Sequence, residues 1–334
     1  IVSERTAADL GDGLGRLTLG GAANAVTLTE DGTHPFGLKL STLTTTSAGI
    51  SLTQPTGTPP QSLGVTFNAQ PVAGEGVTIG LTLPDGSSEG ITLKAVVGTP
   101  GRGEFQIGAD ANATAANFSA ALNTALTEMG STKLAAASAF AAADNFFNGQ
   151  GRGVMRVDGP PFNTATGLIA ADPATTVMWY QGGDDANPRQ SVTSKIDESA
   201  TAAYGVQANE SGIVQLVRSL AAVAVQSFPS ADGTSKERFD AVATRNISRL
   251  AESHNSEPGS IEMISVELGN TQATVANISE RHKNYSATLQ QVLSDIETVP
   301  KEDVAMELLA LQTRLTASYQ AMSMVSQLSL VNYM

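Results

Sequence analysis

The sequence has no cysteine among its 334 residues. This absence excludes disulfides, thiolate nucleophiles and zinc–thiolate sites together. Histidine is almost absent too, since only His34, His254 and His282 occur and no two of them are close in the sequence. The chain also has no HExxH pair, no GxSxG elbow and no P-loop. We therefore expect a protein without catalytic residues, bound metal or cofactor, and not an enzyme.

Aromatic and basic residues are also scarce. Aromatic residues make up 5% of the chain, and 19 Lys and Arg stand against 32 Asp and Glu, for a net charge of −13. Binding to a phosphate backbone needs clustered positive charge, and stacking on bases needs aromatic faces. Nucleic acid and anionic membrane surfaces are therefore not expected partners.

Long hydrophobic runs are missing as well. The longest apolar stretch, residues 220–225, is far shorter than the roughly 20 residues that cross a bilayer. No signal peptide is recognisable, because Glu4 and Arg5 follow Ile1 closely. Since the first residue is not Met, we expect that the chain begins inside a longer gene product.

What is present divides into two patterns, with a change near residue 208. The first pattern is rich in Gly, Thr, Val and turn signals. Residues 77–83 alternate apolar with small or polar side chains, as a half-buried strand does, and Pro84-Asp85-Gly86 then forms a turn. A strand at 90–96 completes the clearest predicted hairpin. Further strands are predicted at 16–19, 25–29, 154–157, 177–180 and 192–196.

One helix is predicted inside this first region. Phe118, Leu122 and Leu126 recur at every fourth position within residues 113–129. The Ala-rich stretch 133–147 fits either a helix or a strand. The connections between strands are mostly too short for repeated βαβ crossovers, which predicts an α+β fold with antiparallel strands. We expect residues 1–208 to form this outer region, with a possible division into 1–60 and 61–208.

The second pattern is helical and covers residues 209–334. Helices are predicted at 210–228 and 235–253, joined by a turn at 229–233. A sustained heptad seam follows, with the 3.5-residue periodicity that indicates a coiled coil or a long bundle helix. Its positions are Ile264, Leu268, Thr271, Val275, Ile278, His282, Tyr285, Leu289, Val292, Ile296 and Val299.

A last helix is predicted after Pro300. Proline is tolerated in a first helical turn, and Glu302 and Asp303 favour the positive end of the helix dipole. Residues 301–334 contain no Gly or Pro, and a helix of that length measures about 51 Å. Its end, residues 322–334, is apolar on several faces. Such a helix either docks on its own domain or is buried in an oligomer, and the second interpretation is favoured.

The same terminal segment carries a family resemblance. Over roughly residues 300–334 it closely resembles the carboxy-terminal helix of bacterial flagellins and hook–filament-junction proteins. The matching residues are Leu311, Leu315, Ala317, Ser318, Tyr319, Ser326, Leu328 and Leu330, before an ending of the Leu-Val-Asn-Tyr kind. The heptad helix matches more loosely, and residues 158–162 also look like junction proteins.

The resemblance implies a structural subunit of the flagellum, most similar to the junction protein of the hook-associated type. In that family the terminal helices form the inner tube and β-rich domains lie outside. Its members are secreted, without a cleaved signal peptide, and self-assemble for motility. The implied partners are hook, junction and filament subunits, copies of the chain itself and an export chaperone. The implied assembly interface is Leu308, Leu311, Leu315, Tyr319, Met322, Val325, Leu328, Leu330 and Tyr333.

The chain departs from the family at its start, and two alternative functions compete with the junction protein. No long amino-terminal helix precedes the strands, unlike in the family, so this chain is expected to be a fragment of the assembling protein. Filament flagellin shares the terminal helix and is the first alternative. A flagellin-like surface protein that binds polysaccharide is the second, with Trp179 and Tyr180 as its aromatic candidates; a core strand is the competing interpretation of that pair.

Several weaker motifs receive a structural interpretation. The glycine-rich stretches 11–15 and 149–153 do not lie between a strand and a helix, so turns or linkers are expected there rather than phosphate loops. Asp184 and Asp185 lack a calcium-binding ladder of ligands and are expected in a solvated loop. The sequons at Asn112 and Asn246 are expected by chance in a chain rich in Ser and Thr.

Overall fold

The computed structural model describes residues 1–148, 153–298 and 300–327. Contacts divide the chain into two compact units. Unit 1 consists of Ile1–Val192 and Tyr204–Glu267, and unit 2 of Thr193–Ala203 and Leu268–Met334. The mixed α+β character is confirmed. The domain boundary near residue 208 stays a prediction, although the contacts group the first helices after it with the strands.

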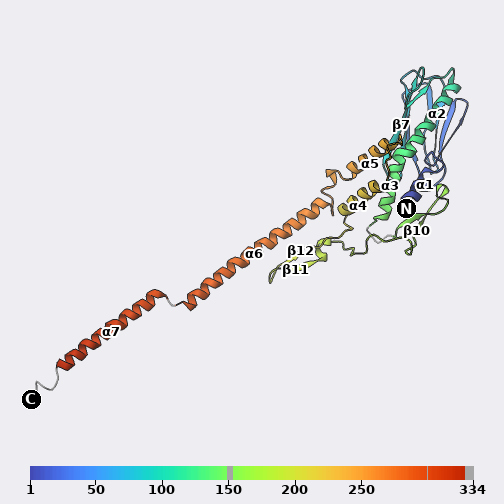
Figure 1. Cartoon of the computed structure of the whole chain (residues 1–334). Coiled ribbons are helices and arrows are strands. Elements are labelled where there is room, and N and C mark those ends of the chain that lie inside the picture. The colour runs from blue at the N-terminus through green and yellow to red at the C-terminus, as the bar shows by residue number, and fades with distance from the viewer. Residues whose placement is uncertain (149–152, 299, 328–334) are drawn as a thin grey trace, which may run out of the picture. The chain divides into compact units, whose positions relative to one another are not determined.

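Unit 1 contains two four-stranded sheets (Figure 1). The first is antiparallel with strands in the order β1 (Leu17–Ala22), β2 (Ala25–Glu30), β5 (Ser62–Phe67) and β4 (Ile50–Thr53). The second has the order β3 (Lys39–Thr45), β6 (Gly76–Thr82), β7 (Ser88–Val96) and β8 (Glu104–Gln106).

The strands expected at 16–19, 25–29, 77–83 and 90–96 are confirmed. In β6 the side chains of Val77, Ile79 and Leu81 are buried and alternate with half-buried ones, as the period of two predicts. Among the described strands, β7 and β8 pair in parallel and all other pairs are antiparallel. Strands β2 and β4, which precede residue 60, pair with β5, which follows it. The first sheet therefore includes residues from both sides of the possible division at residue 60.

Helix α2 (Ala111–Met129) covers both sheets and confirms the helix expected at 113–129. Its start is capped by Asp110, whose carboxylate accepts a hydrogen bond from the Ala113 amide at 2.8 Å. Phe118 is fully buried and meets the rings of Phe67 and Phe105 edge to face, at centroid distances of 5.5 and 5.2 Å. The two sheets and α2 therefore share one hydrophobic core.

The Ala-rich stretch after α2 is helical, which decides between the two predicted alternatives. A single π-helical segment (Gly130–Leu134) leads into α3 (Ala135–Phe146). A short helix that the sequence did not predict, α1 (Val2–Leu10), packs against α3. In α1 the buried Asp9 carboxylate accepts hydrogen bonds from Arg5 at 2.8 Å and from the Gly37 amide at 2.9 Å.

Helices α4 (Ser211–Ala224) and α5 (Ser235–Arg249) confirm the helices expected at 210–228 and 235–253. With α3 they form a second core around Phe140, Ala222 and Val242.

Several ion pairs attach α5 to the rest of unit 1, among them one between Glu237 and Arg102. Arg245 meets the buried carboxylate of Asp85, in the β6–β7 turn, at 2.9 Å, and Arg249 meets Asp144 of α3 at 2.8 Å. Burial raises the pKa of Asp85, but hydrogen bonds from Ser87 and the Arg245 charge outweigh it, so the pKa lies below its ordinary value. The β-hairpin turn is thereby fixed to a helix 160 positions away in the sequence.

Shorter elements complete unit 1. Strands β9 (Met155–Val157) and β10 (Leu168–Ala170) form a two-stranded sheet, and three 3₁₀ turns occur at Phe162–Thr164, Pro188–Ser191 and Glu252–His254. The strand expected at 154–157 is confirmed. The prediction of a strand at 177–180 is wrong, because no described strand pairs with that segment. The Trp179 ring instead packs edge-on against the Phe147 ring, at a centroid distance of 5.5 Å.

Unit 2 consists of long helices and one small hairpin. Strands β11 (Thr193–Lys195) and β12 (Thr201–Ala203) form the hairpin and confirm the strand expected at 192–196. It is fixed to α6 (Ile261–Glu297), most of which belongs to unit 2, by a 3.0 Å hydrogen bond from the Thr271 hydroxyl to the Ala203 carbonyl. An ion pair between Arg281 and Asp197 adds a second attachment.

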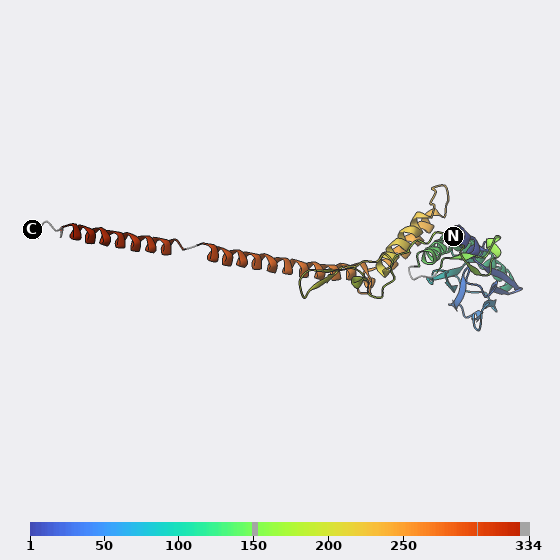
Figure 2. The same cartoon turned by 90° about the horizontal axis from the view of Figure 1, so that it is seen from below.

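Helix α7 (Lys301–Gln327) follows Pro300, as predicted. Figure 2 shows α6 and α7 as two long helices. The heptad seam from Ile264 to Ile296 therefore lies on a helix, whereas its last predicted position, Val299, lies outside the described residues, and a coiled coil is not confirmed. On α6 the later seam residues Tyr285, Leu289, Val292 and Ile296 remain largely exposed.

Candidate assembly surface

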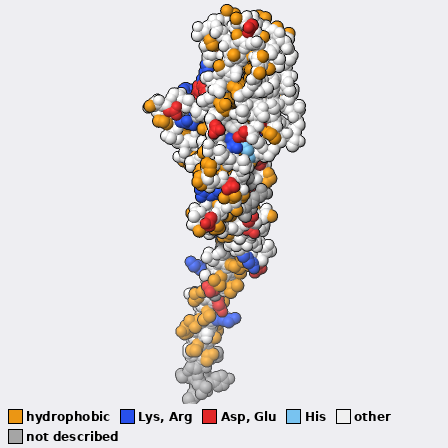
Figure 3. Space-filling view, turned by 90° about the vertical axis from the view of Figure 1, so that its right-hand side faces the viewer, with side chains coloured by type: hydrophobic (Ala, Val, Ile, Leu, Met, Phe, Trp, Pro, Cys, Tyr) orange, Lys and Arg blue, Asp and Glu red, His pale blue; other side chains and the backbone are white. Residues whose placement is uncertain are grey.

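The most conspicuous surface is an apolar stripe on α7. An α-helix turns about 100° per residue, so Leu308, Leu311, Leu315, Tyr319 and Met322 lie within an arc of about 80°. Val325 lies at its border. These six side chains, which we call the α7 stripe, are between 54% and 68% exposed. In the space-filling view hydrophobic side chains recur along the helix that leads to the undescribed residues (Figure 3).

The opposite side of α7 is also partly apolar. Met306, Leu309 and Met324 lie outside the stripe and are exposed as well. All residues of α7 are exposed. A helix that is apolar over most of its circumference is stable in water only when other protein covers it.

Charge is distributed unevenly along α7. Its charged residues all lie in the first half, and residues 315–327 carry no charged side chain; they are Lys301, Glu302, Asp303, Glu307 and Arg314. This second half can therefore enter an apolar environment without leaving an unpaired charge buried.

Six of the nine predicted interface residues thus lie on one face of one helix. The other three, Leu328, Leu330 and Tyr333, lie outside the described residues. That these side chains form an interface stays a prediction.

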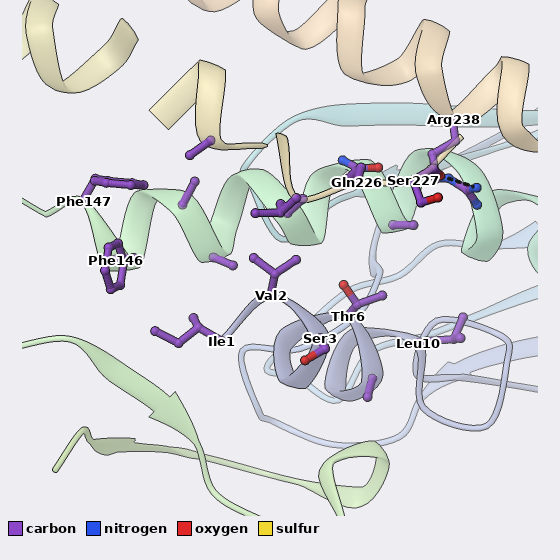
Figure 4. A pocket seen from close by; sticks show the side chains of 17 residues that line it. Ile1, Val2, Ser3, Thr6, Leu10, Phe146, Phe147, Gln226, Ser227 and Arg238 are labelled. Atoms are coloured by element: carbon purple, nitrogen blue, oxygen red, sulfur yellow. Dashed lines mark hydrogen bonds between the residues drawn. The ribbon is translucent and has the colours of Figure 1, made fainter. Parts of the chain in front are cut away.

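A concave apolar surface lies in unit 1, and the sequence did not predict it. A groove of about 930 Å³ runs along α3 between α1 and the segment that follows α4 (Figure 4). Four alanines of α3 line it: Ala135, Ala139, Ala142 and Ala143. Phe146 and Phe147 lie at one end and Arg238 near the other, with Val2 and Thr6 of α1 facing α3 between them.

The polar groups of the groove are few. The Arg238 guanidinium donates to the carbonyls of Ser131 and Ser227 and meets Asp232 at 2.8 Å, so its charge is already paired. Hydrogen bonds from the backbone and hydroxyl of Thr234, joined by Arg238, lower the pKa of Asp232 to about 2. The side-chain amide of Gln226 has a buried nitrogen and a buried oxygen, and neither atom forms a hydrogen bond with a described residue. An amide in this state needs a partner that donates and accepts hydrogen bonds.

One signal in the sequence could have revealed the groove. The four alanines recur at i, i+4, i+7 and i+8, which places small side chains on one face of a helix. The sequence alone does not decide between a helix and a strand for this stretch, so it does not place these alanines on one face.

The weaker sequence motifs, the acidic pair and the glycine-rich stretches, are expected to be structural. The Asp185 amide donates to the side-chain oxygen of Gln207 and the Asp185 carboxylate accepts from the side-chain nitrogen of Gln207, while the Asp184 carboxylate accepts from Asn209. The glycine-rich stretch 11–15 connects α1 to β1, whereas residues 149–152 are not described. Among the described residues no cluster of three or more His, Asp or Glu has metal-binding geometry.

His34 belongs to a buried polar cluster at the start of the first sheet. Its Nε2 lies 2.7 Å from a carboxylate oxygen of Asp31, and its Nδ1 accepts the Phe36 amide at 3.3 Å. The Arg16 guanidinium nitrogen Nη2 also lies 2.8 Å from Nε2, which is therefore placed between one donor and one acceptor. Arg16 pairs with the other Asp31 oxygen at 2.6 Å. Burial and the Arg16 charge lower the pKa of His34, against the opposing effect of Asp31.

No helix within the described ranges is long and apolar enough to span a bilayer. Comparison with family models, with curated proteins and with solved structures found no match to this chain. The flagellar resemblance of its last residues therefore stays a prediction from the sequence.

Proposed function

We propose that this chain is a structural subunit of the bacterial flagellum, placed at the hook–filament junction, and that it assembles through its terminal helix. The observation that carries the proposal is the α7 stripe, whose large apolar side chains are between 54% and 68% exposed on a helix that has no buried residue. Exposed apolar surface of this extent is usual only where another protein covers it. Neighbouring subunits of a polymer provide such a cover.

Two further features support this role. The terminal sequence resembles that of flagellins and junction proteins, from Leu311 to Leu330. The sheets and α2 form a core of their own, independent of α7, as suits a domain presented outside a tube. The choice of junction protein over filament flagellin rests on the resemblance alone.

Deletion of the gene and electron microscopy of the cells test the proposal. We expect complete hooks without attached filaments, with filament subunits released into the medium, and loss of motility. Hooks that still carry filaments would overturn the junction role. Complete hooks with no filament subunit in the medium would instead identify the chain as the filament flagellin.

Complementation with matched variants connects this phenotype to α7. Met322 lies on the stripe and Met324 about 200° around the helix from it, and both are similarly exposed, at 66% and 63%. We expect Met322→Glu to fail to restore motility and Met324→Glu to restore most of it. Equal restoration by the two variants would contradict a role for the stripe.

A further inference from the structure

We propose that His34 is an acid-sensitive latch, which keeps a small apolar cluster around Phe36 closed at neutral pH and opens it on acidification, so that residues 157–165 are released. All groups of the latch belong to unit 1, so it does not depend on the role proposed for α7. The His34 ring is surrounded by groups that its protonated form does not fit, and it lies beside the Phe36 ring, at a centroid distance of 5.8 Å.

The apolar cluster that the latch closes is small and separate from the main core. Its buried members are Ala8, Phe36, Val157 and Ala165, and Phe162 packs against them. They come from α1, from the loop before β3 and from the segment that begins with β9, so three parts of the sequence meet there. A cluster of this size can open while the core of the two sheets stays intact, because proteins open locally where few apolar contacts hold a segment.

One arginine joins residues 157–165 to the first sheet. The Arg16 guanidinium donates to the Asn163 carbonyl at 2.6 Å. It also pairs with Asp31 at 2.6 Å and lies 2.8 Å from Nε2 of His34. Arg16 has a φ of 66°, a conformation that is uncommon outside glycine and persists only where surrounding contacts maintain it. Loss of its contacts with His34 and Asp31 therefore also loosens residues 157–165.

The surroundings of the His34 ring fit its neutral form better than its cation. Its side chain is only 3% exposed. Nδ1 accepts the Phe36 amide at 3.3 Å, whereas Nε2 lies between Arg16, which donates, and Asp31, which accepts. In the cation both ring nitrogens are donors. Nδ1 would then face the Phe36 amide as a second donor, and the ring charge would lie next to the Arg16 guanidinium.

The nearest charges act on the ring in opposite directions. Asp31 favours the cation, but it is shared with Arg16 and 32% of its side chain is exposed. Lys39, the first residue of β3, adds positive charge, and its buried Nζ has no hydrogen-bond partner among the described residues. Burial and the Arg16 charge outweigh Asp31, so the pKa of His34 lies below its ordinary value.

The charged groups of the other neighbouring elements already have partners. In α1 the Asp9 carboxylate accepts from Arg5 at 2.8 Å and from the Gly37 amide at 2.9 Å. The carboxylate of Glu30, the last residue of β2, accepts backbone amides, among them that of Leu40 at 2.9 Å. These carboxylates are therefore occupied when the ring of the latch gains a proton.

Acidification therefore favours the open form of the cluster. In the open form His34 has its ordinary pKa of 6.5, whereas the closed form keeps that pKa lower, so the open form binds a proton more readily. The closed form has its full advantage above pH 6.5 and loses it as the pH falls towards the pKa of the closed form. For a single proton, the open population rises at most about tenfold between pH 7.5 and 5.5.

Hydrogen exchange of the full chain, followed by mass spectrometry of its peptides, tests the latch without any substitution. Each exchange rate is divided by the rate of the same sequence unfolded at the same pH, which removes the intrinsic pH dependence of exchange. We expect the protection of residues 34–38 and 157–165 to fall several-fold from pH 7.5 to 5.5, because amides such as that of Phe36 lose their partners when the cluster opens. Equal protection at both pH values would overturn the latch.

Low concentrations of urea distinguish local opening from unfolding of the whole unit. Urea promotes an opening reaction in proportion to the surface that the reaction exposes. We expect exchange of residues 157–165 to respond little to urea, whereas exchange of β6, whose buried side chains belong to the main core, responds strongly. The same protection and the same urea dependence in both segments would mean that the cluster opens only when unit 1 unfolds, and would overturn the latch.

A substitution that keeps the contact with Phe36 but does not titrate assigns the effect to His34. Asparagine in this position presents an oxygen to the amide two residues later, as Nδ1 does, and has no proton to gain near neutral pH. We expect His34→Asn to show the same protection of residues 157–165 at both pH values. The matched control His254→Asn, at a half-buried position, keeps the fall. A fall of the same size in His34→Asn would contradict the role of His34.

The titration of the His34 ring gives a second measurement that leaves this residue unchanged. Nuclear magnetic resonance resolves the three histidine rings, and substitution of His254 and His282 assigns them. We expect His34 to titrate below pH 6.5 and the protection of residues 157–165 to fall over the same pH range. A His34 ring that titrates at or above pH 6.5 would overturn the latch, whatever the stability of His34→Asn.

Discussion

Helix α2 and helix α7 show how the same kind of helical pattern leads to opposite results. Both carry large apolar side chains at spacings of three and four residues. In α2 these side chains are buried, because two sheets of the same unit lie against them. In α7 no residue is buried. Periodicity therefore determines that a helix forms, whereas the rest of the chain determines whether its apolar face finds a partner.

Helix α6 lies between these two cases. Its first seam residue, Ile264, is buried, and the β11–β12 hairpin is attached beside Thr271 and Arg281. Farther along, Tyr285 and Ile296 are exposed. The hairpin thus covers only part of the seam, and exposure increases along the sequence from unit 1 towards α7.

The largest expected effect comes from removing residues 312–334. Because unit 1 has its own core, we expect the truncated chain to keep the thermal midpoint of that unit, measured by circular dichroism or calorimetry. Self-association, measured by sedimentation or light scattering, should be abolished. Normal polymerisation of the truncated chain would show that the terminal helix does not carry assembly.

A Leu→Ala substitution in α2 and one in α6 should lower the free energy of unfolding by very different amounts. Leu122 of α2 is 1% exposed, and Leu122→Ala should lower the free energy of unfolding by about 2–5 kcal/mol. Leu289 of α6 is 50% exposed, and Leu289→Ala should change it by less than about 0.5 kcal/mol. Chemical denaturation at low protein concentration measures both. Equal costs would indicate that α6 is packed in solution and would remove the contrast between the regions.

A smaller effect concerns pH and unit 1 alone. The folded-state pKa of His34 lies below its ordinary value of 6.5, so the unfolded chain binds a proton at that histidine more readily than the folded chain does. The stabilising contribution is therefore complete above pH 6.5 and decreases as pH falls towards the folded-state pKa.

Variants of His34 make this contribution measurable. We expect unfolding free energy to fall more steeply from pH 7.5 to 5.5 in the unmodified chain than in His34→Gln, which does not titrate. His254, which is only half-buried, is substituted in the same way and provides the control. Equal slopes for the unmodified chain and His34→Gln would contradict the burial argument.

Much of the fold was predictable because it depends on local pattern. The alternation of β6 and the every-fourth-residue spacing of Phe118, Leu122 and Leu126 each fixed an element. Elements held mainly by distant partners escaped prediction. Helix α1 depends on contacts such as Asp9 with the Gly37 amide, and the segment at Trp179 has β-forming residues but no strand to pair with.

The α7 stripe was predictable for the same reason, because it too follows from local pattern. The stripe from Leu308 to Val325 follows from helical spacing, and the structure places all six residues on α7, where they are exposed. The groove was not predictable, because it requires α1, α3 and the segment around Gln226 to come together from three parts of the sequence.

The attachment of α5 to the sheets has a consequence for the order in which unit 1 is completed. Arg245 and Asp85 are 160 positions apart, and Arg249 and Asp144 are 105 apart. During synthesis the two sheets and α2 can associate early, since domains form as the amino-terminal part emerges. Phe140 and the Asp85 carboxylate are nevertheless enclosed only after α5 has packed against them. We therefore expect one side of unit 1 to stay unpacked until residue 249 has left the ribosome. Because these contacts join residues far apart in the sequence, the last step of folding is slow.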